Sequence, residues 1–399
     1  MNEKSNERIQ TWICYLCYFF TGSLVTVTGV VLAPIATFYN CSPGDIAYIF
    51  TVQNAPMFII IIIGGFLMKT VSLKKLFLFG IIIEFIGLAF LQVFLDMTFS
   101  FVFFMGIVGL SGGMFMCLGS FLIVRLYNDP KLRSTRLVMA DFFFSFSGVI
   151  VPYIASQLLE HNVFWLVIYY LITLVGIFML FMVVCTKFPD IVAETHSNKD
   201  LYHEKWGLSV YLVSASCFFF IMGELVFAQW LPLYLQKYVG LSIARAGEFM
   251  SLFWLFMAIG LFAGRFVMKK FKLAPFITVC FLFATIFLLI LSVVPSKYVI
   301  MVSIILCGLF NSVVYACLIA YGSLQVEHAP PTIIAFILGC GTLGTMCSSP
   351  VSGFIANNVS IHAALHSSWV LYIIGFVLFL LTYAFSKAER IHGDIRGTE

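Results

Sequence analysis

Lysine and arginine are distributed very unevenly along this chain, and their distribution constrains the fold more than any other feature. About twelve long apolar runs cover most of the 399 residues, and basic residues collect on alternate connections between the runs. Nineteen of the 22 lysines and arginines fall on one set of connections, and only Lys237, Arg245 and Lys297 fall on the other. Because basic residues favour the cytoplasmic side of a membrane protein, this pattern predicts an even number of spans with both termini in the cytoplasm.

The composition supports a membrane protein and excludes several other classes. Hydrophobic residues make up 62% of the chain and charged residues only 10%, which is too apolar for a soluble domain. Since each span takes roughly 20 apolar residues, twelve spans leave no room for a large domain outside the bilayer. No basic stretch suits nucleic acid, and no nucleotide-binding, zinc or catalytic motif is present. We therefore expect no cofactor, no metal site and no enzymatic activity.

The apolar runs predict an all-α integral membrane protein of twelve transmembrane helices. The longest polar stretch, between Lys187 and Trp206, divides these helices into two sets of six. The predicted domains are a six-helix bundle at 1–190, a cytoplasmic loop at 191–206, and a second bundle with a short tail at 207–399. The predicted spans are 11–34, 45–68, 76–95, 99–124, 137–158, 164–186, 207–232, 245–268, 274–294, 298–322, 332–356 and 366–386.

The two sets of helices resemble weak copies of each other. A serine precedes the second span and the eighth, a Gly-Leu pair lies in the fourth and the tenth, and a proline lies in the fifth and the eleventh. The distance along the chain between partners is nearly constant, which predicts two pseudo-symmetric bundles as in many transporters. The matching positions are Ser42 and Ser242, Gly109-Leu110 and Gly308-Leu309, and Pro152 and Pro350.

The chain resembles the major facilitator superfamily over its whole length. The glycine-and-basic motif that this family carries after its second helix is matched by Gly65 to Lys75, without the acid, and by Gly260 to Arg265 in the second half. A closer resemblance is to the TsgA proteins of that superfamily. It is carried by Asp141-Phe-Phe-Phe-Ser145-Phe-Ser-Gly148-Val-Ile-Val-Pro152, by Glu204-Lys205-Trp206-Gly207 and by Cys340-Gly-Thr-Leu-Gly-Thr-Met346. The resemblance implies an inner-membrane permease that binds a small-molecule substrate, and leaves the substrate open.

Carboxylates inside predicted spans are the sharpest functional signal, since an ionised acid in the bilayer needs a partner or an aqueous cavity. Glu224 lies in the seventh span between Gly223 and Pro232, where the helix can bend, and Gln229 and Trp230 follow within two turns. This arrangement makes Glu224 the first candidate for a proton-coupling group. A protonated acid that only hydrogen-bonds a neighbouring helix is the alternative.

Two further acids are weaker candidates for proton coupling. Glu84 lies in the third span, and glycines one turn away on its own face favour close helix packing and a structural hydrogen bond. Asp141 lies near the cytoplasmic start of the fifth span, where Arg125 and Arg136 are candidate ion-pair partners. A gating or structural ion pair is therefore the favoured role of Asp141.

Uncharged polar and aromatic residues predict the lining of a substrate cavity, with interhelical packing as the alternative role for each. These cavity candidates are Gln53, Asn54, Gln229, Trp230, Trp254, Asn311 and Tyr315. Basic residues near the cytoplasmic ends of spans are gating candidates, namely Lys69, Arg125 and Arg265.

The sequence thus predicts a secondary transporter of the bacterial inner membrane that works by alternating access as a monomer in the lipid bilayer. Proton symport of a small polar solute is the first hypothesis for its function. Efflux of a small toxic solute by antiport is the second. A non-transporting membrane sensor and a membrane-embedded enzyme remain further alternatives, although the loops offer neither a signalling domain nor a nucleophile–base pair.

Overall fold

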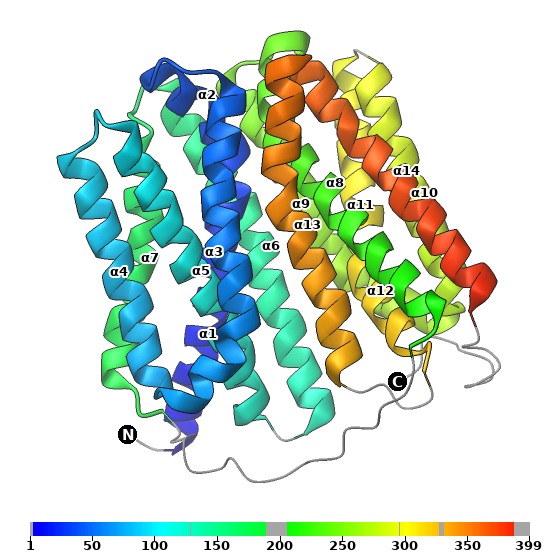
Figure 1. The fold of residues 1–399 in the computed structure, drawn as a ribbon, viewed down its shortest axis with the longest axis horizontal. Coiled ribbons are helices and arrows are strands. Elements are labelled where there is room, and N and C mark those ends of the chain that lie inside the picture. The colour runs from blue at the N-terminus through cyan, green and yellow to red at the C-terminus, as the bar shows by residue number, and fades with distance from the viewer. Residues whose placement is uncertain (1–2, 128, 189–205, 295, 327–330, 387–399) are drawn as a thin grey trace. The chain divides into compact units, whose positions relative to one another are not determined.

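The computed structural model describes residues 3–127, 129–188, 206–294, 296–326 and 331–386. The side chains at positions 3, 4, 65, 69, 130, 131, 134, 265, 269, 331 and 332 lie outside the described part. Every regular element within the described ranges is a helix (Figure 1). Ten of these helices are long and apolar enough to cross a membrane, α11 with α12 forms an eleventh candidate span, and α1 with α2 forms one further, bent span. The prediction of twelve transmembrane helices is therefore confirmed.

The chain divides into two compact units, Met1–Asn198 and Lys199–Glu399. In the first unit, α5 packs against α1, α3 and α4, which explains why α5 is among the most buried helices. Loops of a few residues join neighbouring spans, so consecutive spans run in opposite directions. The elements of this unit are α1 (Glu3–Thr26), α2 (Thr28–Phe38), α3 (Pro43–Thr70), α4 (Leu73–Val93), α5 (Thr98–Leu126), α6 (Pro130–Glu160) and α7 (Leu166–Cys185).

The second unit is organised around α8, which packs against α9, α12, α13 and α14. α8 ends at Gly240, whose φ of 71° lies in the left-handed region that glycine adopts without strain. The elements of this unit are α8 (Leu208–Val239), α9 (Ile243–Val267), the short 3₁₀ helix η1 (Met268–Lys270), α10 (Leu273–Val293), α11 (Lys297–Asn311), α12 (Val314–Ser323), α13 (Pro331–Asn358) and α14 (Ile361–Phe385).

Two spans that the sequence predicts as single helices are interrupted. The first bends by 50° between α1 and α2, at Val27. The tenth is interrupted at Ser312 and Val313, between α11 and α12. The last carbonyl groups of a helix lack hydrogen-bond donors within the helix. At both interruptions a side-chain hydroxyl donates to one of these carbonyl oxygens. Thr28 Oγ1 donates to the Val25 carbonyl oxygen at 2.9 Å, and Ser312 Oγ donates to that of Leu309 at 2.7 Å. Apolarity identified these spans, but it carries no information on backbone continuity.

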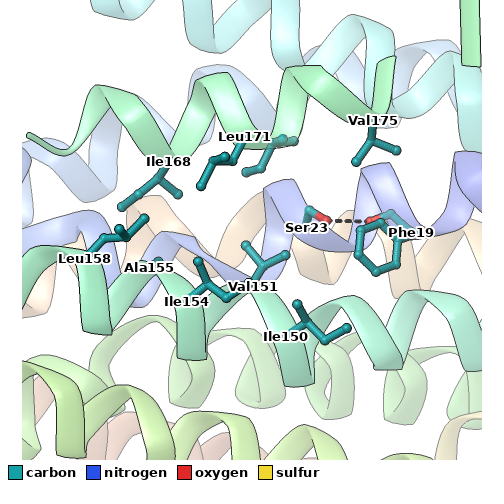
Figure 2. A pocket seen from close by; sticks show the side chains of 11 residues that line it. Phe19, Ser23, Ile150, Val151, Ile154, Ala155, Leu158, Ile168, Leu171 and Val175 are labelled. Atoms are coloured by element: carbon teal, nitrogen blue, oxygen red, sulfur yellow. Dashed lines mark hydrogen bonds between the residues drawn. The ribbon is translucent and has the colours of Figure 1, made fainter. Parts of the chain in front are cut away.

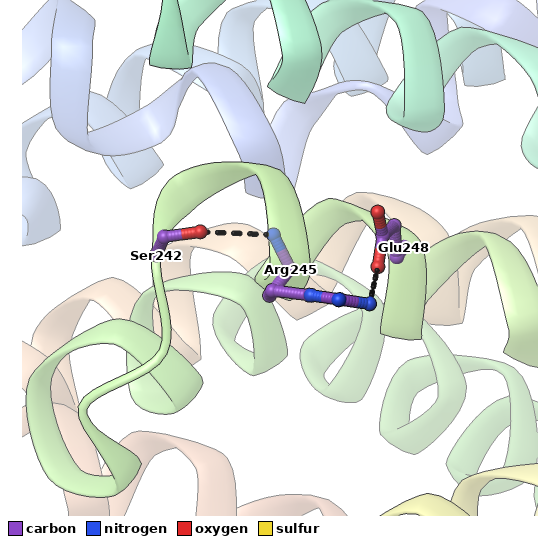
Figure 3. A network of polar contacts seen from close by, with 3 residues as sticks. All are labelled: Ser242, Arg245 and Glu248. Carbon is purple, nitrogen blue, oxygen red and sulfur yellow. Dashed lines mark hydrogen bonds and ion pairs between the residues drawn. The ribbon is translucent and has the colours of Figure 1, made fainter.

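Equivalent serines begin α3 and α9, as the repeat predicts. Ser42 Oγ accepts a hydrogen bond from the backbone N–H of Asp45 at 3.1 Å, and Ser242 Oγ accepts one from that of Arg245 at 3.3 Å. Arg245 also pairs with Glu248 at 2.7 Å, one turn further along α9 (Figure 3). Both helices therefore start with the same N-terminal cap, which satisfies an otherwise unpaired N–H.

Matching glycines bring the backbones of equivalent helix pairs together. A Cβ atom on Gly109 of α5 would overlap the carbonyl oxygen of Gln53 in α3. A Cβ atom on Gly308 of α11 would lie 2.5 Å from the carbonyl oxygen of Phe253 in α9. Only glycine permits either approach, and the two contacts join corresponding helices of the two units. This equivalence confirms the two pseudo-symmetric six-helix bundles.

Candidate transport site

Glu224 is buried in the middle of α8, with only 5% of its surface exposed. Its carboxyl group lies beside the side chains of Asn311 from α11 and Tyr372 from α14. The neighbouring Gly223 permits this close packing, because a Cβ atom there would lie 2.6 Å from the Tyr372 ring. The three residues, which we call the Glu224 cluster, thus come from three different helices of the second unit.

Asn311 is the centre of this cluster. It is fully buried and is the last residue of α11, at the interruption of the tenth span. Its Oδ1 atom accepts a hydrogen bond of 2.6 Å from the Tyr372 hydroxyl. Its Nδ2 atom has no hydrogen-bond partner among the described residues. An amide N–H beside a carboxyl group can donate to it, so Asn311 can stabilise the ionised form of Glu224 without a formal positive charge.

Gln229 and Trp230 follow Glu224 on α8 and bring further unused donors. Gln229 Oε1 accepts a hydrogen bond of 3.0 Å from Ser349 Oγ in α13. Gln229 Nε2 and the indole Nε1 of Trp230 have no hydrogen-bond partner in the described part of the chain. Because buried donors are normally paired, these two N–H groups are positions at which a polar ligand could bind. The structure therefore places several predicted residues on one helix.

Two other predicted cavity residues lie elsewhere in the second unit. Trp254 is buried in α9, where its ring contacts Phe253 at a centroid distance of 5.4 Å. Tyr315 is half-buried in α12 and packs against Gly341 of α13, where a Cβ atom would lie 2.8 Å from the tyrosine hydroxyl.

Glu84 forms a separate buried cluster in the first unit. Its Oε2 atom accepts a hydrogen bond of 2.8 Å from Ser111 Oγ in α5, as the predicted interhelical bond requires. Its Oε1 atom and the nearby Tyr169 hydroxyl of α7 have no hydrogen-bond partner within the described ranges. Gly80 and Gly87 pack tightly against α5 around this acid. The surroundings of Glu84 are therefore those of a packed helix interface.

Asp141 does not form the predicted ion pair. No ion pair joins its exposed side chain to Arg125 or Arg136 among the described residues. Arg136 points to α1 instead, where it donates to the Tyr15 hydroxyl at 3.4 Å, and its guanidinium lies 5.3 Å from the Tyr127 ring. Five residues of helix rotate a side chain by about 140°, so Arg136 and Asp141 face different sides of α6.

Gln53 has a structural contact rather than an open cavity position. It is buried in α3, and its Nε2 atom donates to the Leu24 carbonyl oxygen at 3.3 Å, three residues before the bend at Val27. The adjacent Asn54 is half-buried and also has an interaction partner. Gln53 thus joins α3 to the interrupted first span.

The gating candidates are only partly described. The guanidinium of Arg125 lies 5.5 Å from the ring of Phe121, one turn earlier in α5. Lys69 lies in α3 and Arg265 in α9, and the side chains of both are outside the described part.

Sequence reasoning missed three partners that the structure supplies, namely Tyr372, Ser349 and Ser111. Each lies on an apolar helix and is an ordinary residue for a transmembrane helix. Only packing reveals that they hydrogen-bond Asn311, Gln229 and Glu84. No group of three or more histidine, cysteine, aspartate or glutamate side chains suited to a metal ion occurs within the described residues.

The chain is also similar to known structures over nearly its whole length. A D-xylose–proton symporter matches with a TM-score of 0.75 and 13% identity, over 94% of this chain and 97% of that one. A bacterial homolog of the human lysosomal transporter Spinster, in an inward-facing and occupied conformation, matches with a TM-score of 0.73 and 14% identity, over 94% and 96%. The major facilitator transporter FucP in its outward conformation matches with a TM-score of 0.62 and 18% identity, over 94% and 99%. At these identities the likeness establishes the fold.

Sequence comparison establishes the family. The model of the Major Facilitator Superfamily matches residues 12–332. Proteins named TsgA homolog from Yersinia pestis and Yersinia pseudotuberculosis are 36% identical over 99% of this chain and 100% of their own length. Together with the twelve spans, these matches show that the chain is a multi-pass inner-membrane protein that belongs to the TsgA family of major facilitator superfamily secondary transporters.

Proposed function

We propose that this transporter couples the movement of a small polar solute to the movement of protons, with Glu224 as the proton-carrying group. The observation that carries the proposal is the position of this acid, buried beside Asn311 where α11 ends. An intramembrane acid is costly unless function requires it, which makes it a functional candidate by default. The unused N–H of Asn311 can stabilise the carboxylate after the proton leaves.

Glu84 supports this assignment by contrast. Both acids are buried, but Glu84 already accepts a hydrogen bond from Ser111 and lies between glycine-packed helices. Glu224 lies on the same helix as Gln229 and Trp230, whose N–H groups are available to a polar solute. We therefore propose Glu224 for coupling and a structural role for Glu84.

Alternating access would supply the transport cycle in this proposal. The two compact units would move against each other as bodies, with both termini in the cytoplasm and one chain forming the functional unit. The interrupted first and tenth spans support such movement, because a helix without continuous hydrogen bonds bends more easily.

The solute is found first by thermal unfolding of the purified protein against sugars, nucleosides, amino acids, organic anions and oxyanions. A ligand that binds only the folded state raises its apparent stability. We expect one class of small polar compound to raise the unfolding temperature. Stabilisation by apolar compounds alone would contradict the proposed substrate class.

The coupling group is then tested by Glu224→Gln, with Glu84→Gln as the matched control. Glutamine keeps the shape of the side chain but carries no exchangeable acid proton. In proteoliposomes, Glu224→Gln should exchange solute across the membrane yet fail to accumulate it under a proton gradient, whereas Glu84→Gln should accumulate it. Normal accumulation by Glu224→Gln would exclude this acid as the coupling group.

A further inference from the structure

A cavity of about 220 Å³ lies in the first unit between α1, α6 and α7, and no residue of the Glu224 cluster lines it. Its floor is buried and includes Ser23 of α1, Ala155 of α6 and Ile172 of α7. Figure 2 shows these helices surrounding the space, with branched aliphatic side chains pointing into it from α6 and α7. The site is therefore built by three helices of one unit.

The lining of this cavity offers nothing to a polar ligand. Ten of its eleven lining residues are aliphatic or aromatic. The exception is Ser23, whose hydroxyl already donates to the Phe19 carbonyl oxygen at 2.7 Å (Figure 2). An apolar cavity of about 150 Å³ excludes water and binds benzene, so a cavity of this size and lining selects an apolar group. It cannot be the site of the small polar solute.

The cavity opens through a rim of exposed aliphatic side chains. Ile154 of α6 and Leu171 of α7 are each 42% exposed, although both lie well inside membrane spans. The lining covers the second half of α6 and the first half of α7, so the opening lies in the half of the bilayer nearest the α6–α7 connection. Lipid acyl chains are the apolar groups present at that depth.

The floor of the cavity also touches the interrupted first span. Ser23 lies one turn before the bend, and its carbonyl oxygen accepts the Val27 N–H at 3.2 Å. An apolar group in the cavity therefore packs directly against the last turn of α1. This contact, together with the buried floor, distinguishes the cavity from the smooth lipid-facing surface of a helix.

We propose that the cavity between α1, α6 and α7 is a specific binding site for one acyl chain of a membrane lipid. The chain enters between Ile154 and Leu171 and ends over Ala155 and Ser23. Its binding is driven by van der Waals packing against the three helices, because the lipid phase that the chain leaves is as apolar as the cavity. This lipid site is independent of the transported solute.

The test uses the full chain in nanodiscs with a phosphatidylglycerol that carries a photoreactive diazirine on its acyl chain. Labelled residues are mapped by mass spectrometry. Labelling at the cavity-lining residues Ile154, Leu158, Ile168 and Leu171 should saturate as the photoreactive fraction rises, whereas labelling at Leu174 and Ile177, which are exposed on α7 and do not line the cavity, should rise in proportion. If labelling of the wild-type protein rose in proportion to the photoreactive fraction at all of these positions, the proposal would be overturned.

Two variants separate the cavity from the general lipid surface. Ala155→Phe places a ring in the cavity and should reduce its labelling at least about fivefold, since the added volume leaves no room for a chain. Ile177→Phe changes an exposed position of α7 outside the cavity and should leave cavity labelling unchanged. If Ala155→Phe does not fold, Val175→Phe replaces it, because Val175 also lines the cavity and the larger ring should likewise reduce the labelling. Equal cavity labelling in all folded variants would contradict a defined site.

A photoreactive apolar compound of benzene size provides the last comparison. The lipid and the compound should compete for the same residues, because one cavity holds either. Cavity labelling by the compound without any by the lipid would overturn the acyl-chain assignment.

Discussion

Tyr372 donates a hydrogen bond of 2.6 Å to Oδ1 of Asn311, the residue at which α11 ends. The bond links α14 to the interrupted tenth span and leaves the other end of the Asn311 amide directed to the neighbourhood of Glu224. A buried amide that is fixed at its oxygen has few orientations left for its nitrogen. We infer that Tyr372 is a positioning residue, which holds the Asn311 N–H ready for the Glu224 carboxylate.

Removal of this hydroxyl is expected to destabilise the protein. Tyr372→Phe leaves Asn311 Oδ1 buried without its donor, which costs about 1–3 kcal/mol of unfolding free energy. Tyr169→Phe is the matched control, because the Tyr169 hydroxyl is also buried but has no partner among the described residues. Thermal unfolding should show a clear decrease for Tyr372→Phe and little change for Tyr169→Phe. Equal effects of the two changes would contradict a stabilising hydrogen bond between Tyr372 and Asn311.

Glycine at position 308 is expected to be required by its close backbone contact. Gly308→Ala puts a methyl group 2.5 Å from the Phe253 carbonyl oxygen and should cost about 1–3 kcal/mol or more. Gly339→Ala in α13 adds a methyl group with no atom within 4 Å and should stabilise the helix by about 0.5–1 kcal/mol. We therefore expect Gly308→Ala to lower the unfolding temperature and Gly339→Ala to raise it. A neutral Gly308→Ala would contradict the described approach of α9 and α11.

The repeated helix caps predict a second pair of matched effects. Ser42→Ala and Ser242→Ala each remove a side-chain bond to a backbone N–H and should cost about 0.5–2 kcal/mol. Ser42→Ala should cost no more than Ser242→Ala, because the bond that Asp45 accepts at 3.0 Å comes from the backbone N–H of residue 42, which alanine keeps. Ser72 precedes α4 without a side-chain cap, so Ser72→Ala should have little effect. Chemical unfolding ranks the three, and a Ser72→Ala effect as large as the others would refute the cap explanation.

The distribution of basic residues predicts the orientation of the chain in the membrane. A reporter fused after Glu399 should be active in the cytoplasm, and one inserted next to Lys237 should be active outside it. Reversed activity of both reporters would contradict this topology, while the fold itself would remain.

The sequence was sufficient for the helices of this fold because apolar length is a strong signal in membrane proteins. Ten of the twelve predicted spans match single helices of the structure, and the repeat read from Ser42 and Ser242 recurs as two equivalent caps. Apolar length could not reveal the interruptions at Val27 and Ser312. Val27 is as apolar as its neighbours, and serine also occurs within continuous transmembrane helices. Backbone continuity depends on hydrogen bonds that only the packed structure shows.

The sequence indicated which residues could form the candidate site, but it did not indicate which residues hydrogen-bond one another. Buried acids are rare enough that Glu84 and Glu224 could be selected without a structure. The position of Tyr372 beside Asn311 depends on how α11 and α14 pack, and the turn of Arg136 toward Tyr15 depends on its rotation about α6. Sequence spacing along one helix says nothing about contacts between helices, so the Tyr372 bond was missed, and the expected Asp141 ion pair is not among those recorded for the described residues.

Proton uptake that accompanies solute entry tests the proposed coupling most directly. Proteoliposomes without an imposed gradient receive the solute identified by thermal unfolding, and a pH indicator outside them records the protons that leave the medium. The wild-type protein and Glu84→Gln should make the medium more alkaline as solute enters, and Glu224→Gln should not. Solute entry into wild-type vesicles without any change in external pH would contradict proton coupling through Glu224.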